Sequence, residues 1–151
     1  MTPPSVRVQT ATFDVGTETA ALLAECPQAG AVASFLGVVR STPERPIVAL
    51  TLEHYPAMTH SALAGIAAEA KNRFDLLGCV VIHRVGRLLP GAPIVLVLTA
   101  ASHRQAALDG TGFLIDWLKT AAPFWKKEEL ANGTAAWVAA RVQDDAAAAR
   151  W

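Results

Sequence analysis

Three of the four lysines in this chain lie close together near its C-terminal end, at Lys119, Lys126 and Lys127. Four of the ten aromatic residues fall within residues 113–125, so these lysines have bulky apolar neighbours. An arginine stays protonated at every usable pH, whereas a lysine removed from water can lose its proton and act as a base or nucleophile. Lys119 and Lys126 are therefore candidate catalytic amines. The alternative is that the aromatic residues fill the core and the lysines form a solvated rim.

Pro123 is expected to end a helix just after Lys119 and to be followed by a short strand. Side chains alternate between the two faces of a strand. Lys126 should therefore share one face with Phe124 and Glu128, and Lys127 should lie on the other face with Trp125. Glu128 could pair with one of the lysines and tune its protonation.

A second candidate site is Ser102-His103-Arg104-Gln105, which fits the capping-box pattern S-x-x-Q at the start of a helix. The first turn of a helix offers free backbone N–H groups and a positive dipole end, which favour an anion. Cations placed there are unfavourable by a few tenths of a kcal/mol unless a phosphate or carboxylate binds. The pattern indicates an anion site. A solvated arginine and a surface histidine are the alternative.

Arg40 is a third candidate, because it follows the apolar segment AVASFLGVV and precedes a proline-containing loop at 41–46. Binding residues are often found where a rigid element meets a loop, although a surface arginine is equally common there. His54 and His83 lie in strand-like segments with apolar neighbours. We interpret both as structural histidines whose ring nitrogens have hydrogen-bond partners.

The composition limits the classes of function. Thirteen Lys and Arg balance thirteen Asp and Glu, which argues against nucleic acid as the main partner. Cys26 and Cys79 form no Cys-x-x-Cys pair and are expected to be small buried residues, so sulfur chemistry would need sulfur from outside. The N-terminus does not read as a secretory signal, and a cytoplasmic location is expected. No metal or cofactor is expected.

The hydrophobic pattern predicts a single domain of the α/β or α+β class with mixed strand directions. Amphipathic helices are expected over 57–74 and 103–120, and a short helix over the Ala-rich end at 145–150. Two short strands near 124–130 and 134–140 should be joined through Asn132-Gly133. The remaining strands are expected at 5–13, 30–40, 47–55, 79–88 and 93–101.

Four motifs together resemble one known family. LTLEHYPAMTHSAL, HRVGRLLPG, ASHRQAA and DWLKTAAPFWKKE are similar to segments of the MoaE family, the large catalytic subunit of molybdopterin synthase. The similarity runs over roughly residues 30–141. It implies one MoaE-like domain over 1–151, with 143–151 as a C-terminal tail or short helix. The implied fold is an α/β hammerhead-type core with an additional small antiparallel β subdomain.

The resemblance also implies a reaction and partners. Members of the family form homodimers, and a small ubiquitin-like sulfur carrier docks on each outer side to give a heterotetramer. They convert cyclic pyranopterin monophosphate (precursor Z) into molybdopterin by adding two dithiolene sulfurs. Each sulfur arrives as a thiocarboxylate on the Gly-Gly tail of the carrier.

The resemblance implies site residues at the matching positions of this chain. Lys119 and Lys126 would be closest to the chemistry. The arginines and His103 would hold the phosphate and pterin. The full set of implied binding residues is Val38, Val39, Arg40, His103, Arg104, Lys119, Lys126, Lys127, Glu128 and Arg141.

Helix geometry separates two of these residues. If 103–119 is one continuous helix, sixteen steps of about 1.5 Å put His103 about 24 Å from Lys119. One small substrate cannot span that distance within one pocket, so the two residues would have to come from different copies of a homodimer. A break at Gly110 or Gly112 would remove this argument.

Two other functions fit the same residues. A non-catalytic module could bind a peptide tail with the basic and aromatic patch. A Schiff-base lysine enzyme could act on a small phosphorylated carbonyl compound, since a lysine among aromatic residues beside an anion site would serve there too.

Overall fold

The computed structural model describes residues 3–138, 142–149 and 151. The described chain is a mixed α/β fold with two four-stranded sheets. Its elements, in chain order, are β1 (Ser5–Gln9), α1 (Val15–Glu25), β2 (Ala31–Val38), β3 (Ile47–His54), α2 (Pro56–Arg73), β4 (Gly78–Arg84), β5 (Gly86–Leu88), β6 (Pro93–Ala101), α3 (Arg104–Thr120), β7 (Phe124–Leu130), β8 (Ala135–Trp137) and α4 (Val142–Ala149).

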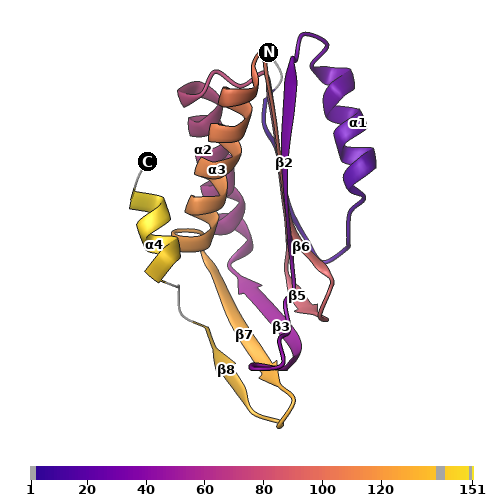
Figure 1. The fold of residues 1–151 in the computed structure, drawn as a ribbon, viewed down its shortest axis with the longest axis vertical. Coiled ribbons are helices and arrows are strands. Elements are labelled where there is room, and N and C mark those ends of the chain that lie inside the picture. Colours follow the sequence, from indigo (N-terminus) through magenta and orange to yellow (C-terminus); the bar gives the residue numbers. More distant parts are fainter. Residues whose placement is uncertain (1–2, 139–141, 150) are drawn as a thin grey trace.

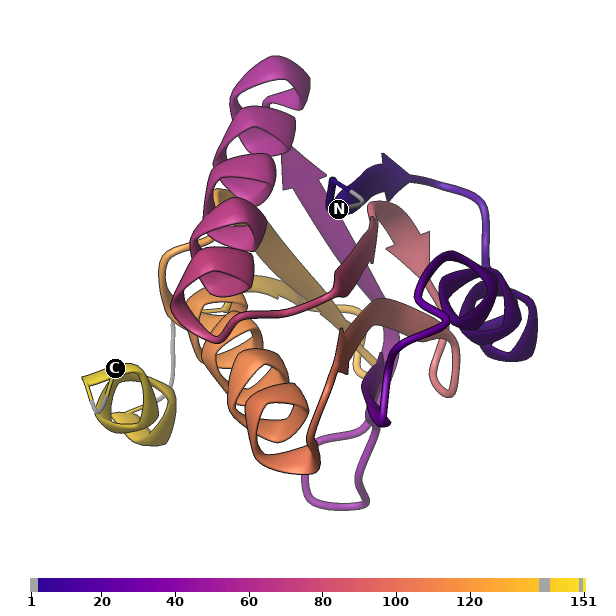
Figure 2. The same ribbon diagram turned by 90° about the horizontal axis from the view of Figure 1, so that it is seen from above.

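The first sheet has the strand order β1-β4-β6-β2 and forms the middle layer of the molecule. β1 runs parallel to β4, and the other neighbours are antiparallel, so the prediction of mixed strand directions is confirmed. Helices α2 and α3 cover one face and α1 covers part of the other (Figures 1 and 2). Because helices cover both faces, the central strand β6 is buried at every position after Pro93.

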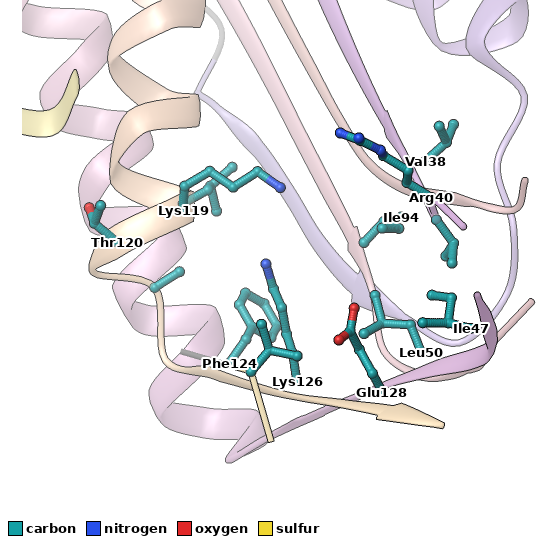
Figure 3. Close-up of a pocket in the computed structure, with 14 residues that line it drawn as sticks. Val38, Arg40, Ile47, Leu50, Ile94, Lys119, Thr120, Phe124, Lys126 and Glu128 are labelled. Carbon is teal, nitrogen blue, oxygen red and sulfur yellow. The ribbon is translucent and has the colours of Figure 1, made fainter. Parts of the chain in front are cut away.

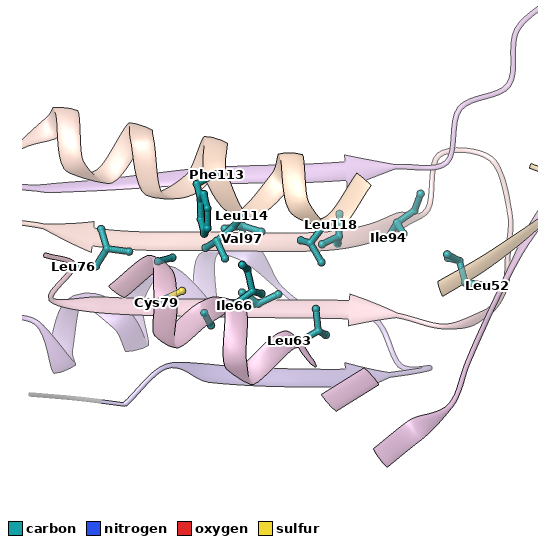
Figure 4. Packing of buried hydrophobic residues seen from close by; sticks show 14 of the residues in the cluster. Leu52, Leu63, Ile66, Leu76, Cys79, Ile94, Val97, Phe113, Leu114 and Leu118 are labelled. Atoms are coloured by element: carbon teal, nitrogen blue, oxygen red, sulfur yellow. The ribbon is translucent and has the colours of Figure 1, made fainter. Parts of the chain in front are cut away.

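Two apolar clusters hold these layers together. The larger lies between the sheet and the α2–α3 layer, where Leu63, Leu114 and Val97 are fully buried (Figure 4). The smaller joins α1 to the opposite face through Leu22 and its neighbours. Each fully buried side chain of this size contributes about 1.5–3 kcal/mol, so the two clusters fix how α3 lies on the sheet.

The second sheet has the order β5-β3-β7-β8, is antiparallel throughout, and extends beyond the first sheet at one end of the molecule (Figure 1). The prediction of one strand over 79–88 was wrong. The segment divides at Val85 into β4 and β5, which belong to different sheets. Gly86 has a φ of +90°, which glycine adopts readily and which lets the chain turn there.

Helix α1 was not anticipated from the sequence. Asp14 caps it by accepting a hydrogen bond from the Thr17 N–H at 2.8 Å, which also lowers the pKa of the Asp14 carboxyl. Only Leu22 of this helix is buried, so its apolar face is narrow. No helix in the described part of the chain is long and apolar enough to cross a membrane.

Candidate active site

A cavity of about 460 Å³ opens where the end of α3 meets β7 and the end of β2 (Figure 3). Six of the ten expected site residues line it, although they come from three separate segments of the sequence. Its lining residues are Val38, Val39, Arg40, Ile47, Leu50, Ile94, Leu118, Lys119, Thr120, Ala122, Phe124, Lys126, Glu128 and Val138.

Two lysines enter the cavity from different elements. Lys119 lies in the last turn of α3, where the negative end of the helix dipole favours its positive charge. Lys126 comes from β7, and Phe124 and Glu128 share its face, as the alternation predicted. In Figure 3 both amino groups point into the same space beside the Phe124 ring. The convergence of two amines suits the binding of an anionic group or the transfer of a proton.

Arg40 adds a third positive charge at the end of β2, and in Figure 3 its side chain extends into the cavity. The preceding Val39 is buried, and its backbone is held on both sides. Its N–H donates to the Ala92 carbonyl at 2.9 Å, and its carbonyl accepts from the Gly91 N–H at 2.8 Å. These bonds fix the backbone from which Arg40 projects.

Among the described residues Glu128 forms its ion pair with an arginine and not with a lysine, so the expected pairing was wrong. Its carboxylate accepts a hydrogen bond from Arg45 Nε at 2.8 Å and lies 2.7 Å from Arg45 Nη2. Arg45 belongs to the loop between β2 and β3 and was not singled out from the sequence. Arg45 therefore compensates the charge of Glu128, and Arg40, Lys119 and Lys126 are the basic residues that line the cavity among the described residues.

His83 packs against Phe124, a residue of the cavity wall. Its ring stacks on Phe124 with a centroid distance of 3.9 Å and an interplanar angle of 17°. Burial lowers the pKa of His83 to about 4. The positive charges of Lys126 and Lys119 also lower this pKa, whereas the hydrogen bond to the Arg84 carbonyl raises it. The ring nitrogen Nδ1 lies 2.9 Å from the Arg84 carbonyl oxygen. The prediction of a hydrogen-bonded structural histidine is confirmed here.

The same prediction was wrong for His54. Both of its ring nitrogens are buried without a hydrogen-bond partner among the described residues. The ring forms a T-shaped contact with Phe124, with a centroid distance of 6.2 Å and an interplanar angle of 77°. Phe124 therefore has ring contacts with two imidazoles, and no pattern in the sequence pointed to this arrangement.

The anion site expected at the start of α3 is a separate hollow, lined by Gly30, Ser102, His103, Arg104 and Gln105. The capping-box prediction was wrong. His103 is the N-cap residue, and no described side chain caps the helix. Gln105 instead donates to the Asp109 carboxylate at 2.9 Å. The first backbone N–H groups of the helix are therefore available to an anion.

Helix α3 is continuous from Arg104 to Thr120, with no break at Gly110 or Gly112. His103, the N-cap residue, and Lys119 are thus about 24 Å apart along one helix. Within one chain, the structure does not bring His103 and Arg104 to the lysine cavity. Any single site that uses both ends of the helix needs two copies of the chain.

Two expected site residues remain. Lys127 lies outside the cavity, because it is on the opposite face of β7, with its amino group 5.7 Å from the Trp137 ring centroid. Arg141 lies outside the residues that the structure describes.

The cysteines are buried free thiols, as expected. Burial raises the pKa of Cys79 to about 12 and also raises the pKa of Cys26. The thiolate is the reactive form of cysteine, and burial of this kind suppresses it. Neither residue lines the cavity. Sulfur for a reaction there would have to be delivered by another molecule.

Comparison with known proteins gives consistent matches. The model of the family described as MoaE protein matches residues 8–121. The molybdopterin synthase catalytic subunit of Ralstonia nicotianae is 54% identical over 149 residues, covering 98% of this chain and 84% of that protein. The molybdopterin synthase catalytic subunit of Pseudomonas aeruginosa is 52% identical, covering 97% of this chain and 98% of that protein.

Solved structures agree with the fold. The molybdopterin biosynthesis MoaE protein of Burkholderia ambifaria has a TM-score of 0.84 at 50% identity, covering 98% of this chain and 97% of that one. A chain in the complex of subunits 1 and 2 of molybdopterin-converting factor from Helicobacter pylori has a TM-score of 0.72 at 22% identity, covering 93% and 92% of the two chains. The second match shows likeness of fold alone.

Proposed function

This chain belongs to the MoaE family, and from that premise we propose that it acts as the catalytic subunit of a molybdopterin synthase. The enzyme is a sulfurtransferase of molybdenum cofactor biosynthesis. It moves sulfur from the thiocarboxylated tail of a small carrier protein to cyclic pyranopterin monophosphate and so forms the dithiolene of molybdopterin. The observation that carries this proposal is the cavity in which Arg40, Lys119 and Lys126 converge.

The charge of the cavity suits the proposed reactants. The pterin phosphate and the carrier thiocarboxylate are both anions, and the thiocarboxylate must come close to a carbon atom of the pterin. Arg40, Lys119 and Lys126 supply three positive groups, while Glu128 is paired with Arg45. At an effective dielectric constant of about 20, opposite charges about 4 Å apart attract by about 4 kcal/mol. Arg40, Lys119 and Lys126 therefore bind the two anions next to each other.

We assign the two lysines to the chemical step. They hold the thiocarboxylate near the electrophilic carbon of the pterin and stabilise charge or transfer protons there. Arg40 anchors the substrate. The apolar residues around them exclude water, which strengthens these interactions. Lys127 is left out of the centre because it lies on the other face of β7.

The complete centre requires two copies of the chain. His103 and Arg104 of one copy would bind the phosphate beside the lysines of the other, since the length of α3 keeps the two groups apart within one chain. Each homodimer would then contain two centres. With one carrier docked at each, the assembly is a heterotetramer.

We propose that residues 1–151 act as one domain and that the protein works in the cytoplasm. Free thiols at Cys26 and Cys79 fit a reducing compartment.

The test is turnover by lysine variants. Purified carrier thiocarboxylate and precursor Z are incubated with the wild type, Lys119→Ala, Lys126→Ala and Lys127→Ala, and molybdopterin is measured by mass spectrometry. We expect the first two variants to lose conversion while keeping their fold and carrier binding. Lys127→Ala is the matched control and should convert the substrate like the wild type.

The other functions predict different outcomes. A non-catalytic module would bind the carrier while even the wild type left precursor Z unchanged. A Schiff-base enzyme would become covalently trapped by borohydride with a small phosphorylated carbonyl compound, and Lys119→Ala would abolish trapping. Full conversion by Lys119→Ala would remove Lys119 from the mechanism.

A further inference from the structure

The turn between β2 and β3, residues 41–46, separates two residues of the cavity wall. Arg40 precedes the turn and Ile47 follows it. Strand pairing is irregular on both sides, with one register shift near the end of β2 and another near the start of β3. Irregularities of this kind interrupt the regular ladder and redirect side chains. The hydrogen bonds of Val39 hold the backbone before Arg40, so the turn decides the course of the backbone after it.

Hydrogen bonds within the turn hold its ends together. The Ile47 N–H donates to Ser41 Oγ at 3.0 Å, which joins the two sides of the turn. The Arg45 N–H donates to the carbonyl and hydroxyl oxygens of Thr42, both at 3.1 Å. Two of the six residues of the turn are prolines, whose ring fixes φ. The turn is therefore a compact unit that would shift as a whole.

Two contacts link this turn to the region of β7. The Ala131 N–H, just beyond the end of β7, donates to the Pro46 carbonyl at 3.1 Å. Arg45 Nε donates to the Glu128 carboxylate at 2.8 Å, and Arg45 Nη2 lies 2.7 Å from the same oxygen. Glu128 lines the cavity together with Lys126 of the same strand. The ion pair therefore connects the turn that follows Arg40 to the strand that carries Lys126.

Arg45 itself is outside the set of described residues that line the cavity, and its side chain is 57% exposed. Its partner Glu128 is only 17% exposed, and in Figure 3 the Glu128 carboxylate points into the cavity. An exposed ion pair contributes little to the free energy of unfolding. The loss of Arg45 should therefore leave the fold intact, and its effect should appear in substrate binding.

We infer that Arg45 is a positioning residue for Arg40. In Figure 3 Arg40 and Lys119 extend towards each other from two sides of the cavity. By linking the turn to β7, Arg45 keeps the Arg40 guanidinium at a fixed place relative to the amines, without touching the substrate. A group held in its binding position loses less conformational freedom when the substrate binds. This inference rests on the proposed function, which assigns Arg40 as the anchor of the substrate.

A second ion pair on β7 provides a matched control. Arg87 of β5 donates to the Glu129 carboxylate at 2.8 Å, and the two side chains are 54% and 36% exposed. Glu129 lies on the opposite face of β7 from Glu128, because side chains alternate along a strand. Neither Arg87 nor Glu129 is among the described residues that line the cavity. Arg87→Ala therefore removes a similar ion pair from the same strand without disturbing the turn.

The first test does not depend on the reaction. Trypsin can cut the turn after Arg40, whereas the proline that follows Arg45 prevents cleavage there. Arg45→Ala and Glu128→Gln should each release fragment 1–40 about 3- to 10-fold faster than the wild type, because the turn opens more often without its link to β7. Mass spectrometry measures the release, and Arg87→Ala should match the wild type. Wild-type release from both Arg45→Ala and Glu128→Gln, or equal acceleration by Arg87→Ala, would overturn the inference.

The second test is kinetic. Arg45→Ala should raise the KM for the pterin roughly 3- to 30-fold with little change in kcat, whereas Arg87→Ala should leave both unchanged. In the Arg40→Ala background, Arg45→Ala should change the KM by less than about 2-fold, because Arg45 acts through Arg40. A rise of equal size in both backgrounds would show that Arg45 acts through the charge of Glu128 instead, and would overturn the inference. A wild type that leaves precursor Z unchanged would refute the proposed function, and the tryptic test would still decide whether Arg45 holds the turn.

Discussion

The buried imidazole of His83 should make the free energy of unfolding depend on pH. Burial lowers its pKa from the ordinary 6.5 to about 4, so the ring is neutral in the folded protein at working pH. The unfolded chain binds a proton near pH 6.5, whereas the folded chain does not until about pH 4. Between these values the unfolded state holds more protons, and the free energy of unfolding therefore falls as the pH falls.

The magnitude follows from the size of the shift. One pKa unit corresponds to 1.36 kcal/mol, so the whole shift is worth about 3 kcal/mol and is lost between about pH 6.5 and pH 4. At pH 5 about 2 kcal/mol should already be gone. The Phe124 ring stacks on this imidazole, and a charge placed there would repel both lysines of the cavity.

The assay is urea unfolding of the wild type and of His83→Phe at pH 7 and pH 5, with the free energy of unfolding obtained by linear extrapolation. The wild type should lose about 2 kcal/mol more than His83→Phe between the two pH values. His60→Phe is measured alongside as the matched substitution at an exposed histidine. Equal losses in the wild type and His83→Phe would refute the argument.

Two further predictions concern the cavity wall. Arg40→Ala should raise the KM for the pterin by about 10- to 100-fold with a smaller change in kcat, because a hydrogen bond to a charged group is worth about 1.5–3 kcal/mol. An unchanged KM in steady-state kinetics would count against the role of Arg40 in anchoring the substrate. Arg45→Ala and Glu128→Gln should each reduce turnover, and their combination should cost little more than either alone, since both break the same ion pair. Fully additive losses in this double-mutant cycle would show that the pair does not act as a unit.

Local patterns in the sequence were sufficient for most elements. The apolar segments predicted β2, β3 and β6 to within about two residues, and Pro123 correctly separated α3 from β7. Strand alternation correctly put Phe124, Lys126 and Glu128 on one face. Each of these inferences depends only on residues that are neighbours in the chain.

The errors arose where distant residues decide the outcome. Val85 and Gly86 divide one apolar segment because the two halves join different sheets, which no local pattern reveals. Arg45 and Glu128 are 83 residues apart in sequence, so their ion pair could only be found in the structure. Helix α1 did leave a local signal, the cap at Asp14, but a single buried leucine gave it little apolar periodicity.

The shared centre is the claim on which the account depends, and a mixed dimer tests it most directly. One chain carries Lys119→Ala, its partner carries Arg104→Ala, and different tags allow the mixed dimer to be purified away from both inactive parents. One of its centres then contains both substitutions and the other contains neither, so molybdopterin formation per dimer should recover to about half of the wild-type rate. A mixed dimer as inactive as its parents would show that Lys119 and Arg104 serve the same centre within one chain, and would contradict the account.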